Sequence, residues 1–330
     1  MMRKAGLLLL LSILVGSPCF GQEWARKMFK DREHDFGTVA HSAKAEYRFV
    51  LENIYLEDIH IAGVRSSCGC TTPTVETPLL KTYEKGAILA HFNTGTFSGQ
   101  RGATLTVTID KPFYAEVQLQ VRGNIRTDTV LEPGSAQFPS IDQGVAYDQK
   151  VVVNHTGQSD WKILDVKSSN PHISVEAVEI NRARGQVSYE LRVHLDENTP
   201  VGYLNDHLML VTNDSRSTQM PVLVEGRIVP AITVSPASLF MGVVQPGQKV
   251  TKQLVVKGKK PFRIMSISCD DQSFQFDTSK DDASKELHLI PVTFMAGSDL
   301  GKVTKTIKIK TDTSDAAPEL AAYAVVAAAQ

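Results

Sequence analysis

The chain has 330 residues, of which 42% are hydrophobic and 22% charged, and this composition excludes a disordered chain and an integral membrane protein. Its 35 basic and 36 acidic residues leave a formal net charge of −1, so no overall positive charge favours nucleic acid or an anionic membrane. The length exceeds one ordinary core and predicts two or three domains of about 100 to 150 residues each.

Residues 1–21 have the pattern of a signal peptide, in which two basic residues precede an apolar run over 7–15 and small residues follow. The run is far shorter than the roughly 20 residues that a spanning helix needs. We expect cleavage after Gly21 and a bacterial extracytoplasmic protein, either periplasmic or secreted, without a later transmembrane segment. A lipid on Cys19 is the alternative, although Pro18 stands where lipidation sites usually have Gly or Ala.

The segment 22–33 mixes aromatic and apolar side chains with basic ones. Trp24 and Met28 are four residues apart, a spacing that places two side chains on one face of a helix. We therefore expect a short amphipathic helix over Glu23 to Glu33 that packs on the first domain.

Three long internal repeats follow, each opened by a phenylalanine. Phe36, Phe138 and Phe240 recur at equal intervals of 102 residues, and each is followed three residues later by Val or Ile. A fixed period of this kind indicates a repeated structural unit. The predicted domains are 34–128, 129–229 and 230–330.

Within each repeat the hydrophobic pattern has a period of two. Leu105, Val107 and Ile109 alternate with threonines, as expected of strands with one buried and one solvated face. About 100 residues with some seven short strands is the size of an immunoglobulin-like sandwich. The sequence therefore predicts an all-β chain of three tandem immunoglobulin-like sandwiches. The second repeat contains no cysteine, so its core must be held by apolar packing.

One loop of the first repeat stands apart, the stretch from 66 to 73 with the sequence SSCGCTTP. Together with the Phe-Gly-x-Val opening at Phe36, this loop resembles the bacterial domain-of-unknown-function family numbered 1573, a relative of Hydin-type ASH domains and of the major sperm protein fold. The resemblance is closest over about residues 33–124. It implies an extracytoplasmic immunoglobulin-like sandwich and no assigned activity, so function depends on the site itself. In the repeat alignment Cys68 matches Asn170, and neither later copy has the Cys-Gly-Cys loop.

Three interpretations of Cys68 and Cys70 remain open. As a redox pair, residues two apart lie near the upper limit of Cα separation for a disulfide, so a bond between them is strained and easily reduced. As a metal site, two thiolates suit a soft ion such as Cu(I), whereas structural zinc requires four ligands. His60 and His91 lie in the same domain, but their spacing does not bring them to the loop. As packing residues, both cysteines simply fill a tight loop.

Other candidates carry less chemistry. Cys269 occupies the position that matches Ser66 and is interpreted as a small buried residue. The acidic pairs 270–271 and 281–282 lie beside turn residues and indicate solvated loops. The lysines of 302–310 are interpreted as protection of a sheet edge.

No nucleophile elbow, zinc-protease helix, phosphate-binding loop or dinucleotide fingerprint occurs in the sequence. The leading hypothesis is a non-enzymatic extracytoplasmic scaffold that binds a protein or cell-envelope component, without a cofactor and without nucleic acid. The rival is a thiol-redox or copper-binding protein that acts through Cys68 and Cys70. The sequence does not indicate an oligomeric state.

Overall fold

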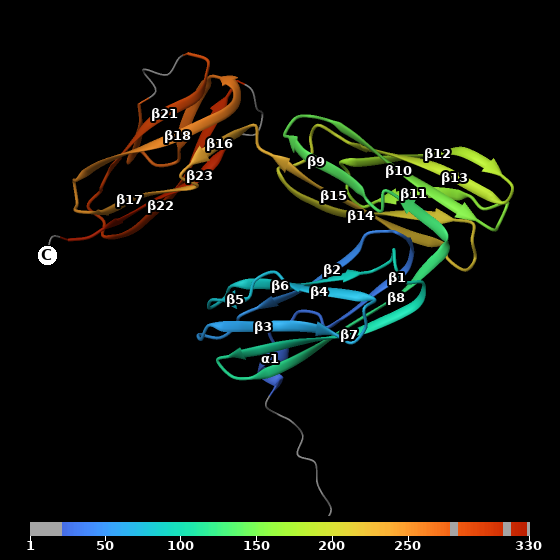
Figure 1. Ribbon diagram of the computed structural model, residues 1–330. Coiled ribbons are helices and arrows are strands. Elements are labelled where there is room, and N and C mark those ends of the chain that lie inside the picture. The colour runs from blue at the N-terminus through green and yellow to red at the C-terminus, as the bar shows by residue number, and fades with distance from the viewer. Residues whose placement is uncertain (1–21, 278–282, 313–317, 329–330) are drawn as a thin grey trace, which may run out of the picture.

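A computed structural model describes residues 22–277, 283–312 and 318–328, and these are almost entirely β-structure (Figure 1). The prediction of an all-β chain of immunoglobulin-like sandwiches is confirmed. Three separate hydrophobic clusters form the main cores. The predicted signal peptide lies outside the described residues, and none of the helices described is long and apolar enough to span a membrane.

The first sandwich packs a short three-stranded sheet, in the order β2-β6-β4, against a larger sheet that contains β8, β7, β3 and β5, with β1 beside β8. Its strands are β1 (Glu33–His41), β2 (Ala45–Glu52), β3 (Ile59–Ser66), β4 (Thr71–Val75), β5 (Leu79–Leu80), β6 (Lys85–Phe92), β7 (Gly99–Lys111) and β8 (Ala115–Glu132).

The second sandwich packs β12-β13-β10 against the four-stranded sheet β11-β14-β15-β9. Its strands are β9 (Ala136–Asp142), β10 (Tyr147–Thr156), β11 (Ile163–Ser168), β12 (Ile173–Ala183), β13 (Gln186–Leu195), β14 (Gly202–Thr212) and β15 (Gln219–Val229).

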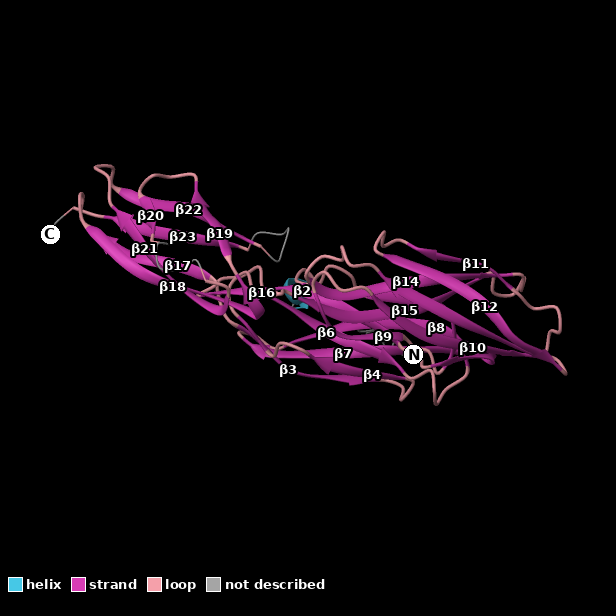
Figure 2. Ribbon diagram, turned by 90° about the horizontal axis from the view of Figure 1, so that it is seen from above, coloured by secondary structure: helices cyan, strands magenta, loops and turns pink. Residues whose placement is uncertain are grey.

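The third sandwich packs β16-β18-β21-β20 against β17-β23-β22-β19, and in Figure 2 it extends to one side of the other two. Its strands are β16 (Ile232–Ser235), β17 (Ser238–Val244), β18 (Lys249–Phe262), β19 (Ile264–Cys269), β20 (Phe274–Phe276), β21 (Lys285–Met295), β22 (Gly301–Thr311) and β23 (Glu319–Val326).

The repeated phenylalanine marks the same strand in all three sandwiches. Phe36, Phe138 and Phe240 lie on β1, β9 and β17, and each of these strands runs parallel to the last strand of its repeat, which is β8, β15 or β23. A register shift interrupts each parallel pair. On β1 the first of two shifts spans Gly37, whose φ of 65° is a left-handed conformation that glycine adopts without steric cost. The period in the sequence therefore reflects a shared strand topology.

The predicted alternation places the core correctly, with one exception. Leu105, Val107 and Ile109 are fully buried on β7, as expected. Thr106, expected on the solvated face, is also buried. Its neighbours in register on β3 and β8 are Arg65 and Gln118, whose long side chains flank the short threonine on that face.

The lead-in helix is shorter than predicted, because α1 spans only Glu23–Arg26. The chain beyond it follows β2: the amide of Lys30 donates to the carbonyl of Val50, and the amide of Glu52 donates to the carbonyl of Met28. These main-chain bonds compete with helix formation. The predicted packing is present, since Met28 is buried in the first core.

The interpretation of the lysine-rich strand as an edge is wrong, because β22 lies between β23 and β19. Two of the four lysines in 302–310 pair with acidic residues of a neighbouring strand and loop. Lys308 pairs with Glu319 at 3.3 Å, and Lys305 pairs with Asp271 at 3.3 Å.

Strand β8 crosses from the first sandwich to the second without a break, and the predicted limit at residue 128 lies inside it. Its first part pairs with β7, and its last residues pair with β10 of the second sandwich. Arg126, 7% exposed, lies at the crossing and contacts Asp128 at 2.5 Å and Asp214 at 2.7 Å. Burial raises the pKa of Asp214, but hydrogen bonds from Arg216 and Arg126 outweigh it and lower the pKa to about 2.

Replacement of Arg126 tests this junction. Arg126→Met keeps most of the side-chain volume but leaves Asp214, 3% exposed, without its closest cation. We expect a loss of about 3–5 kcal/mol in the free energy of unfolding at pH 7, measured by denaturant titration. Arg122→Met is the matched control, because Arg122 is 75% exposed in its ion pair with Asp35 and its loss costs about 1 kcal/mol or less.

The stabilising effect of Arg126 on the free energy of unfolding should also depend on pH. The folded pKa of Asp214 lies below its unfolded value, so its contribution is complete above about pH 4 and is lost as the pH falls toward 2. The difference between the wild-type chain and Arg126→Met should therefore shrink over that window. Equal stability of the two chains at pH 7 would contradict the claim that Arg126 stabilises the junction by its contact with Asp214.

Candidate functional site

The Cys-Gly-Cys loop joins β3 to β4 at the end of the first sandwich nearer the second. The loop is a tight turn in which the amide of Thr71 donates to the carbonyl of Cys68 at 3.4 Å. The Ser66 hydroxyl donates to the same carbonyl at 2.7 Å. The amide of Cys70 donates to the sulfur of Cys68 at 3.1 Å, so Cys68 acts as the side-chain acceptor of the turn.

The repeats place the turn at the same point in every sandwich. Ser66, Ser168 and Cys269 are the last residues of β3, β11 and β19, and each pairs with a core residue of the long strand beside it. The alignment of Cys269 with Ser66 therefore holds in the structure. Cys269 is partly buried, as a strand-end residue packed against the third core.

Two residues after these strand ends, each turn has a side-chain acceptor. Cys68, Asn170 and Asp271 each accept a hydrogen bond from the amide two residues further on, over 3.1, 3.0 and 2.8 Å respectively. Asn170 and Asp271 use oxygen, as in ordinary Asx turns. The first repeat builds the same turn on sulfur.

The two cysteines differ in environment. Cys70 is fully buried in the first core, and its thiol contacts the carbonyl oxygen of Gly102 at 3.6 Å. Burial raises the pKa of Cys70 to about 11. Cys68 is partly exposed, and the side-chain and main-chain hydrogen bonds from Cys70, with the nearby charge of Arg101, lower its pKa.

Neighbouring strands support the turn from the outside. The side-chain amide of Asn93 donates to the carbonyl of Gly69 and, at 3.1 Å, to the hydroxyl of Thr72. The ring of Phe97 lies beside Gly69, and the guanidinium of Arg101 lies 5.9 Å from the centre of that ring. These contacts were not predictable from the sequence pattern, because Asn93, Phe97 and Arg101 lie about 25 to 35 positions further along the chain than the cysteine turn.

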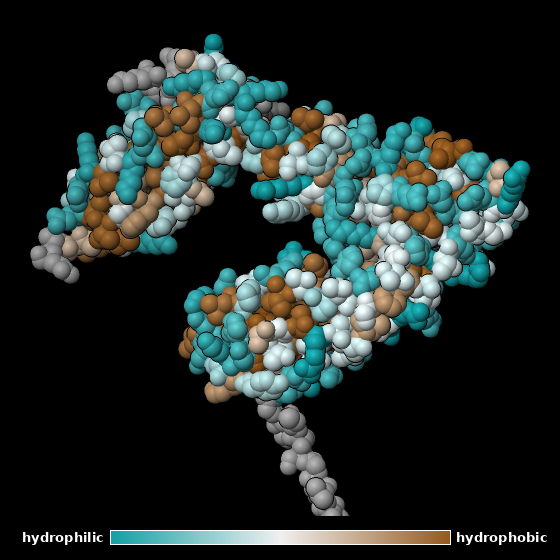
Figure 3. All heavy atoms as spheres, in the orientation of Figure 1, coloured by the Kyte–Doolittle hydropathy of each residue, from teal (hydrophilic) through white to brown (hydrophobic). Residues whose placement is uncertain are grey.

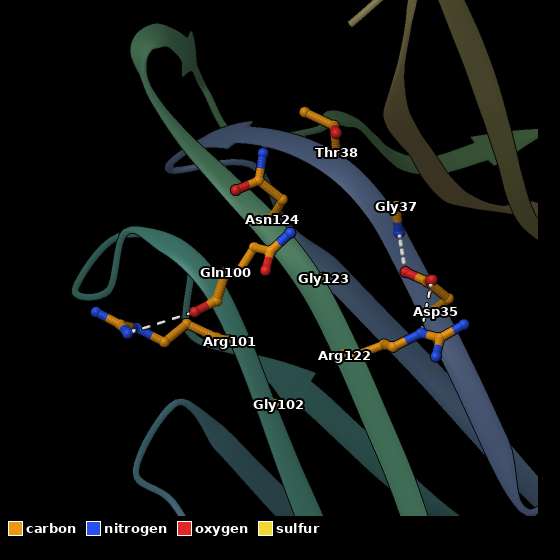
Figure 4. A pocket seen from close by; sticks show the side chains of 9 residues that line it. All are labelled: Asp35, Gly37, Thr38, Gln100, Arg101, Gly102, Arg122, Gly123 and Asn124. Carbon is orange, nitrogen blue, oxygen red and sulfur yellow. Dashed lines mark hydrogen bonds and ion pairs between the residues drawn. The ribbon is translucent and has the colours of Figure 1, made fainter. Parts of the chain in front are cut away.

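A groove of about 640 Å³ lies next to the turn, between β1, β7 and β8 (Figure 4). Arg101 and Gly102 belong to both the groove and the surroundings of the cysteines. The groove contains one carboxylate, Asp35, which is engaged by Arg122 at 2.8 Å and by the amide of Gly37 at 2.8 Å. The lining therefore offers hydrogen-bonding groups and does not bring two acids together for acid–base chemistry.

The other predicted candidates lie elsewhere. His60 pairs with Asp110 at 2.6 Å, and His91 pairs with Glu46 at 3.1 Å, so neither histidine joins the cysteines. Over the described ranges, no group of three or more His, Cys, Asp or Glu side chains is arranged to hold a metal ion. The acidic pair 281–282 lies outside the described residues.

Fold and site together define a protein of tandem immunoglobulin-like sandwiches whose first repeat alone carries a cysteine turn. Residues 28–125 match the family described as "Protein of unknown function (DUF1573)". The resemblance proposed for the first domain is confirmed. No protein with a curated description matches the chain.

Several solved structures resemble parts of the chain. A protein of unknown function from Porphyromonas gingivalis W83 is 14% identical, with 60% of this chain and 100% of that chain covered and a TM-score of 0.24. The I67–I69 fragment of titin is 8% identical, with 91% and 98% covered and a TM-score of 0.23. Cadherin-like domains 1 to 4 of zebrafish RET are 11% identical, with 82% and 65% covered and a TM-score of 0.24.

The repeats supply a direct test of the turn. Cys68→Asn installs the acceptor of the second repeat and should leave the melting temperature close to that of the wild-type chain. Cys68→Ala removes the acceptor and should cost about 0.5–1.5 kcal/mol. Asn170→Ala removes the corresponding acceptor of the second sandwich and should cost more than Cys68→Ala, because the amide oxygen is the stronger acceptor and the Asn170 side chain also donates to Asp206 at 2.7 Å. Calorimetry that finds Cys68→Asn as unstable as Cys68→Ala would show that the turn does not depend on an acceptor at this position.

Proposed function

We propose that the chain is a non-enzymatic, extracytoplasmic bacterial scaffold that holds a binding surface of its first sandwich at a fixed position relative to the second and binds a protein of the cell envelope. The observation that carries the proposal is the uninterrupted strand β8, which belongs to both sandwiches. A shared strand transmits orientation, whereas separate domains on a flexible linker do not.

A second set of side-chain contacts, separate from the Arg126 cluster, reinforces the junction. Lys44, just before β2, contacts Glu225 on β15 at 2.7 Å and Glu46 at 3.5 Å. Glu225 also accepts a hydrogen bond from Ser135 at 3.1 Å. These contacts and the Arg126 cluster lie on different strands, so rotation about β8 has to break at least one of the two sets.

The far end of the first sandwich exposes large apolar side chains, here called the tip patch. Leu56 is 79% exposed, Tyr83 68%, Phe113 71% and Tyr114 64%. The loops that carry Leu56 and Tyr83 are joined by a hydrogen bond from the Thr82 hydroxyl to the carbonyl of Leu56 at 2.8 Å. Hydrophobic atoms reach the surface at this end of the sandwich in Figure 3.

The composition and surroundings of the tip patch favour a protein as its binding partner. Aromatic residues are enriched at protein interfaces and often dominate their binding energy, while a fold gains nothing from exposing four large side chains at one end. Charges of both signs surround the patch, including the ion pair Lys81–Asp58 and the carboxylate of Asp110, which contacts His60. Mixed charge at the rim favours a protein over a uniformly anionic surface.

Affinity capture tests the proposal. The tagged mature chain, cross-linked in its own cells, should recover a reproducible envelope protein, and the double change Phe113→Ser with Tyr114→Ser should reduce recovery at least tenfold. Leu300→Ser is the matched control, because Leu300 is a 61% exposed apolar side chain of the third sandwich. Absence of any reproducible partner, or equal recovery by the patch variant and the control, would overturn the proposal.

A further inference from the structure

The cysteine turn contains more chemistry than its structural role requires. The turn needs an acceptor for one amide, and the second and third repeats supply an oxygen from Asn170 or Asp271. Thiol sulfur is a weak acceptor in comparison with an amide or carboxylate oxygen. Cys68 is therefore the least suitable of the three residues for the shared role, and the turn alone does not account for it.

The turn links the second cysteine directly to the sulfur of the first. The main-chain amide of Cys70 donates to the Cys68 sulfur at 3.1 Å, and the Cys70 thiol contacts the carbonyl oxygen of Gly102 at 3.6 Å. In an extended chain, residues two apart have Cα atoms about 7 Å from each other, at the limit for a disulfide. The turn closed by the Thr71 amide shortens that separation and brings the pair within range.

The two thiols have the different environments that an exchange reaction uses. Cys68 is partly exposed near the positive charge of Arg101, and a hydrogen-bonded amide stabilises a negative sulfur. Cys70 is shielded from solvent behind it. An external reagent therefore meets Cys68 first, and Cys70 is positioned to react only with Cys68.

We propose that Cys68 and Cys70 form a reversible dithiol–disulfide pair in which Cys68 is the attacking thiolate and Cys70 the resolving thiol. The Cys68 thiolate attacks one sulfur of an external disulfide, whose S–S bond breaks; a mixed disulfide forms, and the first thiolate leaves and takes a proton from water. Cys70 then attacks the Cys68 sulfur as its proton passes to the departing external thiolate, so the second external thiol is released and the buried sulfur keeps no charge. Two electrons pass from the pair to the external disulfide.

The surroundings favour this pair over a soft-metal site. A metal held by both cysteines requires Cys70 as a thiolate, and its burial makes that charge costly. A disulfide between the same atoms is neutral. His60 and His91, two histidines of the same sandwich that the sequence did not bring to the loop, are engaged by Asp110 and Glu46.

The test uses the full mature chain with Cys269→Ser, so that the pair supplies the thiols, and 5,5′-dithiobis(2-nitrobenzoate) as the external disulfide. The reduced pair should release two equivalents of thionitrobenzoate and end as a Cys68–Cys70 disulfide, identified by peptide mass spectrometry. Cys70→Ser should release one equivalent and retain the mixed disulfide on Cys68. Cys68→Asn keeps the turn acceptor, so the buried Cys70 should react at least tenfold more slowly.

The opposite results are equally clear. A stable mixed disulfide on Cys68 in the chain that retains both cysteines would overturn the resolving role of Cys70. Reaction of Cys70 in Cys68→Asn at the rate of the intact pair would overturn the order of attack, provided that circular dichroism shows both variants folded. A second measurement, the pH dependence of alkylation, should give a lower midpoint for Cys68 in Cys70→Ser than for Cys269 in the wild-type chain, whose pKa burial raises.

Discussion

Strand β8 is the constraint on which the arrangement of the first two sandwiches depends, because one run of backbone satisfies hydrogen bonds in both. Main-chain groups inside a sheet need partners, and residues 115–125 of β8 find them on β7 while residues 129–132 find them on β10, so only three residues separate the two pairings. Arg126 then stabilises the crossing by bonding carboxylates from both sides of it, Asp128 on β8 and Asp214 in the second sandwich. Orientation is thus determined by main-chain bonding and a buried charge cluster together.

The three repeats share one strand topology but differ in their surface and turn residues. All three share the parallel pairing of first and last strands and the turn after β3, β11 or β19. The first adds the tip patch at one end and the sulfur turn at the other, with Cys70 buried between the sheets. A common scaffold therefore carries specific chemistry in one repeat, and the other two serve as internal controls for what the fold itself requires.

Much of this architecture is predictable from the sequence for identifiable reasons. The interval between Phe36, Phe138 and Phe240 reports a strand that recurs in space, and the alternation at Leu105, Val107 and Ile109 reports a buried face. These patterns are local or strictly periodic, so they can be recognised in the sequence without knowledge of tertiary contacts.

The features that escaped prediction depend on pairing between distant segments. Nothing near residue 128 marks a turn, and the continuity of β8 follows only once β10 is seen beside it. The acceptor role of Cys68 was not predicted, because the residues usually expected to accept a hydrogen bond in a turn are Asn, Asp and Ser. The alignment of Cys68 with Asn170 was the one signal of this role in the sequence. The approach of Arg101 to Cys68 arises from the pairing of β7 with β3.

The central claim is that the first two sandwiches form one stiff unit, and the distance between them in solution tests it most directly. Spin labels at Lys85→Cys on β6 and Glu176→Cys on β12, with the native cysteines replaced by serine, can be measured by pulsed electron resonance. A continuous strand predicts one narrow distance distribution that is unchanged by ionic strength, since main-chain bonds are insensitive to salt. A broad or multiple distribution would contradict the account.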